Sequence, residues 1–112
     1  MLVTTTENVT NHQVKQTLGE VFGVVVRSRS LAGNIAASFR SIAGGEIKQY
    51  TRMVEEARRH AVERMIENAR SMGANAILMM RFDSSEIAQF MTEVVAYGTA
   101  VILDPAPPAE TP

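Results

Sequence analysis

The sequence predicts a small α+β domain in which helices cover one face of an antiparallel sheet. Its 112 residues are 46% hydrophobic and 21% charged, which is typical of one compact domain with a buried core. One stretch near the middle has apolar residues at the three- and four-residue spacing of a helix, and β-branched runs lie before and after it. The predicted order of elements is β-α-α-β-β, with one long and one short helix.

The first predicted strand covers residues 21–29, where the β-branched run VFGVVV leads into RSR. A shorter strand is expected over residues 2–5. The short helix is expected over residues 35–42, because Ile, Phe and Ile stand at its first, fifth and eighth positions. The Gly-Gly pair at 44–45 then allows the chain to turn into the long helix.

The long helix is expected from about residue 46 to residue 72. The face opposite its apolar stripe carries charged residues such as Glu55 and Arg59. Gly73 provides the residue with a left-handed backbone conformation that often ends a helix. The apolar stripe consists of Val54, Ala57, Ala61, Met65, Ala69 and Met72.

Two further strands are expected over residues 76–82 and 94–103, joined as an antiparallel hairpin through residues 84–91. Alternate residues of 94–103 fall on opposite faces of the strand, and neither set is polar. A strand that is apolar on both sides is normally buried on both sides. Either the short helix wraps around to the second face or a second copy of the chain covers it. We expect a homo-oligomer, because so much exposed apolar sheet would promote aggregation.

All four prolines lie in residues 104–112, which contain no large apolar side chain. Proline continues neither a strand ladder nor a helix, so the fold is expected to end near Leu103. We therefore expect one domain over residues 1–103 and a disordered Pro-rich tail over residues 104–112.

Charge and cysteine content exclude several classes of function. A net charge of −1 argues against an electrostatic nucleic-acid binder, and the absence of cysteine removes disulfides, thiolate metal sites and cysteine nucleophiles. The longest uncharged apolar run, residues 94–103, is about half the length of a membrane-spanning helix. The first residues lack the pattern of a signal peptide. We expect a cytoplasmic protein with no membrane or nucleic-acid partner.

Few side chains could carry out catalysis. His60 lies beside the apolar stripe of the long helix, where it needs no catalytic role, and His12 lies in a polar segment. Glu56 and His60 are one helical turn apart and could supply two ligands of a metal site, although such a pair is more often a surface interaction. We expect no enzyme activity and no cofactor.

One group of polar residues is a candidate ligand-binding site. Arg27 and Arg29 are two residues apart on one predicted strand and therefore share a face. Asn34 and Arg40 follow in the chain, and Asp83 ends a later predicted strand. These residues could bind an anionic ligand at a subunit interface. Alternatively, the arginines could pair with carboxylates of a neighbouring subunit or face the solvent.

Several motifs resemble those of the YbjQ-like family of bacterial and archaeal proteins. The matching residues are Phe22–Val25, Gly33–Ile35, Arg40–Gly45, Tyr50, Glu55, Ala57–Arg58, Ala61, Ala69–Ala76, Phe82–Asp83 and Gly98–Val101. The resemblance covers about residues 1–103. It implies a three-stranded antiparallel sheet with helices, in a dodecin-like arrangement, assembled into a ring of five subunits.

The heavy-metal-binding label that the family often carries does not suit this chain. No thiolate is available for soft metals, and Asn75 stands where the family more often has Asp. The family offers no catalytic residue to carry over. We expect a non-enzymatic pentameric module that binds a small ligand, ion or partner at subunit interfaces. The alternative is a heavy-metal-binding protein that uses His60 and carboxylates.

Overall fold

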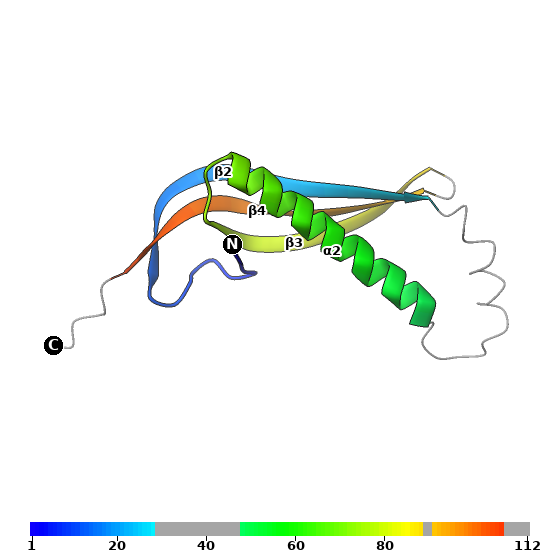
Figure 1. Cartoon of the computed structure of the whole chain (residues 1–112), viewed down its shortest axis with the longest axis horizontal. Coiled ribbons are helices and arrows are strands. Elements are labelled where there is room, and N and C mark those ends of the chain that lie inside the picture. The colour runs from blue at the N-terminus through cyan, green and yellow to red at the C-terminus, as the bar shows by residue number, and fades with distance from the viewer. Residues whose placement is uncertain (29–47, 89–90, 107–112) are drawn as a thin grey trace.

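The computed structural model describes residues 1–28, 48–88 and 91–106, in which one helix lies across a four-stranded sheet (Figure 1). The elements are β1 (Leu2–Val3), β2 (His12–Ser28), α2 (Lys48–Ser71), β3 (Ala76–Ala88) and β4 (Met91–Pro105). The predicted α+β class is confirmed. The short helix predicted over residues 35–42 lies outside the described residues.

The sheet is mixed rather than fully antiparallel. Its order is β1-β3-β4-β2, and β4 runs antiparallel to both of its neighbours. β1 pairs in parallel with the start of β3, where Leu2 lies opposite Ala76. The three-stranded antiparallel sheet implied by the resemblance therefore gains a fourth strand, because the N-terminal residues add to the outer edge of β3.

β2 begins at His12 rather than at Val21, where the sequence predicts it to start. The side chains of residues 12–17 are exposed, so this part of the strand has no apolar run by which to recognise it. Its backbone nevertheless pairs with β4, with bulges between Val14 and Gln16 and before Gly19, whose φ is 123°. Backbone pairing therefore extends the strand well beyond the part that packs against the helix.

β3 and β4 form the predicted antiparallel hairpin, but the predicted connection over residues 84–91 is wrong. β3 continues to Ala88, which pairs with Met91 of β4. The side chains of residues 83–88 are exposed, and this segment remains paired with β4 through its backbone. At its other end β4 continues to Pro105, which lies opposite His12.

α2 confirms the predicted long helix over the described residues. The centre of the predicted stripe is buried, whereas Val54 and Met72 near its ends are partly exposed. Gly73 follows the helix with a φ of 90°, and its N–H donates a 2.9 Å hydrogen bond to the Arg70 carbonyl. The buried central residues are Ala57, Ala61, Met65 and Ala69.

Gly23 allows α2 to lie directly on β2. A Cβ atom at this position would overlap the carbonyl oxygen of Ala61 and the amide nitrogen of Met65. Both are backbone atoms, so no change of rotamer could relieve the overlap. The absence of a side chain at Gly23 therefore sets how closely the helix approaches the sheet.

Buried apolar clusters lie on both faces of the sheet. The larger cluster joins α2 to the sheet and includes Val21, Val25 and Ala96. A smaller cluster contains Leu78 and Leu103 among its members, and Val9 packs against it. The helix thus covers one face, and the segment around Val9 contacts a part of the other.

Candidate functional site

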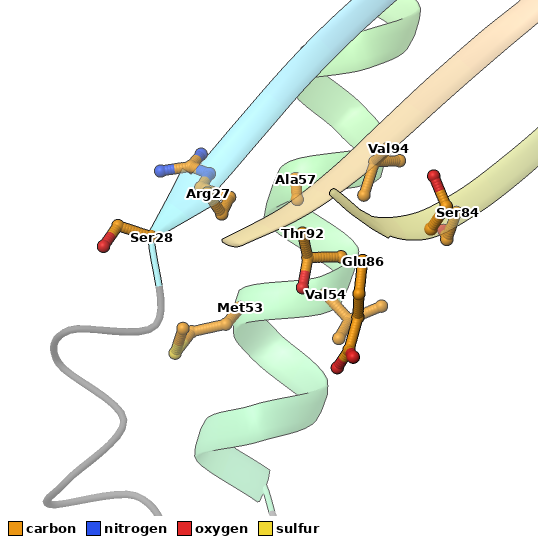
Figure 2. Close-up of a pocket in the computed structure, with 10 residues that line it drawn as sticks. Arg27, Ser28, Met53, Val54, Ala57, Ser84, Glu86, Thr92 and Val94 are labelled. Carbon is orange, nitrogen blue, oxygen red and sulfur yellow. The ribbon is translucent and has the colours of Figure 1, made fainter. Parts of the chain in front are cut away.

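A pocket of about 350 Å³ opens between the first turns of α2 and the ends of β2, β3 and β4 (Figure 2). Because α2 crosses the face of the sheet obliquely, its N-terminal turns extend past the β3 side of the sheet at this end (Figure 1). The apolar wall consists of Met53, Val54, Ala57 and Val94. The volume is near the lower limit of known small-molecule sites, which is roughly 300 Å³.

Polar side chains from three strands also line the pocket. In Figure 2, Thr92 and Glu86 extend from the strand ends towards Val54 of α2. The Thr92 hydroxyl is buried and has no hydrogen-bond partner among the described residues. Since an unpaired buried hydroxyl is costly, a polar group that reached Thr92 would be stabilised there. The polar lining residues are Arg27, Ser28, Ser84, Ser85, Glu86 and Thr92.

Arg27 connects the end of β2 to the middle of α2. Its Nη2 lies 2.7 Å from Nδ1 of His60. A guanidinium can only donate hydrogen bonds, so Nδ1 of His60 is the acceptor and the neutral ring carries its proton on Nε2. The contact therefore fixes both the position and the tautomer of the His60 ring.

Two other side chains of α2 cover the outer edge of β2. Arg64 Nη1 donates a 2.6 Å hydrogen bond to the Val24 carbonyl, and Asn68 Nδ2 donates a 2.8 Å hydrogen bond to the Phe22 carbonyl. These carbonyls belong to an edge strand, whose backbone groups would otherwise be available to another strand. The helix thus protects this part of the edge from strand addition.

The face of the sheet away from α2 carries an apolar patch that no described element covers, which we call the open sheet face. It consists of Phe22, Val24 and Val26 of β2 with Val95 and Tyr97 of β4. Phe22 and Tyr97 lie directly opposite each other and are 53% and 44% exposed. The sequence shows this strand to be apolar on both sides. Over this region α2 covers one side, and no other described element covers the second.

The structure describes two of the five predicted ligand-binding residues and separates them. Arg27 lines the pocket, on the face of the sheet that packs against α2. Asp83 pairs in register with Val95, so it belongs to the opposite face of the sheet, next to the open sheet face. The other three, Arg29, Asn34 and Arg40, lie outside the described residues.

Sequence reasoning missed the contact of Arg27 with His60 and the contributions of Glu86 and Thr92 to the pocket. Arg27 and His60 are separated by 33 residues, and no local pattern relates a strand end to a helix face. Glu86 falls in the segment predicted as a connection. β3 continues past Phe82 through backbone pairing, and the exposed side chains of residues 83–88 form no apolar run that would indicate a strand.

The described residues do not form a metal site. Residues 1–28, 48–88 and 91–106 contain no group of three His, Cys, Asp or Glu side chains able to hold an ion. His60, the metal-ligand candidate of the sequence, has its Nδ1 occupied by Arg27. In the same part of the chain, no helix has the length and apolar character required to span a membrane.

Comparison with known proteins relates nearly the whole chain to one family. A family model described as "Putative heavy-metal-binding" matches residues 1–104. A UPF0145 protein of Bradyrhizobium sp. (strain ORS 278) is 64% identical over 106 residues, covering 95% of this chain and 96% of the relative. A UPF0145 protein of Sulfurisphaera tokodaii is 54% identical over 103 residues, covering 92% and 90%.

A solved structure shares the fold. It is a protein of unknown function from Pediococcus pentosaceus ATCC 25745, assigned to the DUF74 family. The match has a TM-score of 0.62 at 16% sequence identity and covers 93% of this chain and 98% of that one. At such low identity the similarity concerns the fold alone. The extent of the family match and the identity of the relatives show that this chain belongs to the YbjQ-like family, UPF0145.

Proposed function

We propose that this protein is a non-enzymatic cytoplasmic module that assembles into a homo-oligomeric ring of five copies. In this proposal it binds a small ligand, ion or partner at its subunit interfaces. The observation that carries the proposal is the open sheet face, where Phe22 and Tyr97 form the centre of an apolar patch that no described element covers. Contiguous apolar surface of this kind marks an interaction site in soluble proteins.

The charges of the chain favour a second copy as the occupant of the open sheet face. A net charge of −1 gives little repulsion between identical subunits. By register, Arg81 lies opposite Tyr97, and Asp83 lies opposite Val95, so both signs of charge border the patch. A surface with an apolar centre and a rim of mixed charge resembles the usual anatomy of a protein interface.

The pocket supports the ligand-binding part of the proposal. Apolar side chains of α2 meet polar side chains of three strands there, and Arg27 contributes a permanent positive charge at its rim. Asp83 borders the open sheet face and would therefore lie at or near the proposed interface. We propose that Arg27, Arg29, Asn34, Arg40 and Asp83 contribute to ligand binding in the assembled protein.

The assembly is tested by placing a polar side chain on the open sheet face. Phe22→Ser and Tyr97→Ser should each reduce the mass measured by size-exclusion chromatography with light scattering from an oligomer towards a monomer. Met72→Ser is the matched control, because Met72 is 38% exposed, directly follows α2 and lies outside the open sheet face. If both sheet variants assembled like the control, the open sheet face would not be the interface.

A further inference from the structure

We infer that Arg27 prevents His60 from acting as a metal ligand, so that the metal-binding label of the family does not extend to this histidine. His60 is the only histidine on α2, and Glu56 lies one turn before it. These two residues are the pair that the sequence suggests for a metal site. In the folded protein, however, the ring nitrogen Nδ1 is 2.7 Å from the guanidinium of Arg27.

The hydrogen bond blocks both ring nitrogens, for different reasons. Nδ1 cannot bind a metal because its lone pair accepts the hydrogen bond from Arg27. Nε2 carries the proton of the neutral ring, and a metal needs an unprotonated nitrogen. Moving the proton to Nδ1 would free Nε2, but it would place an N–H of His60 against an N–H of Arg27. The Arg27 contact therefore has to break before His60 can coordinate an ion.

Metal-binding histidines normally have the opposite kind of hydrogen-bond partner. In metal sites the nitrogen that does not bind the ion usually donates to a carboxylate or a carbonyl oxygen, which makes the ring a better ligand. Here that partner is replaced by a cationic donor. Arg27 also carries a permanent charge at hydrogen-bond distance from the ring, and this charge repels a divalent cation.

The inference predicts that removal of the guanidinium exposes a latent two-ligand site. Arg27→Met keeps an unbranched side chain but removes both the donor and the charge. His60 can then adopt either tautomer, and Glu56 can approach as a second ligand from the preceding turn. Arg59→Met is the matched control, because Arg59 is an exposed arginine next to His60 in the sequence.

The experiment titrates Zn²⁺ and Ni²⁺ separately into the chelator-treated full chain and measures binding by calorimetry. Wild type and Arg59→Met should show no saturable binding at concentrations that saturate Arg27→Met. The gain in affinity should be about 10-fold or more, the size of effect that hydrogen-bond partners of ligating histidines have. Arg27→Met/His60→Ala should lose this gain.

The tautomer of His60 in the wild-type protein provides a second readout that needs no variant to fold. Nitrogen-15 NMR should show an unprotonated Nδ1 and a protonated Nε2. The inference is overturned by the opposite tautomer, or by wild-type metal binding that His60→Ala abolishes. It is also overturned if folded Arg27→Met binds both metals no better than wild type.

Discussion

The substitution Gly23→Ala should destabilise the protein by disturbing the contact between β2 and α2. The added Cβ would overlap the backbone at Ala61 and Met65, so α2 has to move away from the sheet. Arg64 and Asn68 hydrogen-bond α2 to the edge of β2 and oppose that movement. Overpacking of a core costs about 1–3 kcal/mol, and we expect the upper end of this range because only backbone atoms are involved.

A loss of about 3 kcal/mol corresponds to a fall in melting temperature of roughly 10 °C or more in a domain of this size. Thermal unfolding followed by circular dichroism measures this change, with all samples at one protein concentration because assembly contributes to stability. Thr17→Ala is the control, since Thr17 is an exposed residue of the same strand. A Gly23→Ala protein that melted within a few degrees of the control would refute the close approach of α2 to β2.

Three further substitutions test separate parts of the fold. Asn75→Ala removes two hydrogen bonds, of 2.9 and 2.7 Å, that its side chain makes with the backbone of Leu103; denaturant unfolding should show a loss of about 1–3 kcal/mol. Gly73→Val places a β-branched residue at a φ of 90° and should lower the melting temperature, with a cost of about 1–2 kcal/mol. Arg64→Met uncovers the Val24 carbonyl on the edge of β2 and should increase aggregation, measured by light scattering during slow heating. If the stability, the melting temperature or the onset of aggregation did not change, the structural role given to the corresponding residue would be wrong.

The elements that the sequence predicts well are those whose buried side chains form an apolar pattern. The helix is recognisable because Ala57, Ala61 and Met65 recur at helical spacing and face the sheet. The first part of β2 and the last part of β3 are not recognisable from the sequence, because their side chains are exposed. Only the backbone pairing with β4 holds them in the sheet. A search for apolar runs therefore finds the part of each strand under the helix and misses the remainder.

The candidate site also has one part that the sequence predicts and one part that it does not. Arg27 can be selected from the sequence because it follows an apolar strand, but its partner His60 cannot, because their contact depends on where α2 crosses β2. The exposed pair of Phe22 and Tyr97 is different. The two-sided apolar pattern of residues 94–103 predicts a second apolar face that the short helix or a second copy has to cover, and the structure then identifies which β2 residues belong to that face.

The mass of the assembled protein decides whether the chain forms a ring of five copies. Native mass spectrometry of the full chain, purified without chelator, should show a species of five copies of the 12.2 kDa chain, about 61 kDa. Bound ligand would add a stoichiometric mass to that species. A monomer of 12.2 kDa at micromolar concentration would contradict the account, because no second copy would then cover the open sheet face.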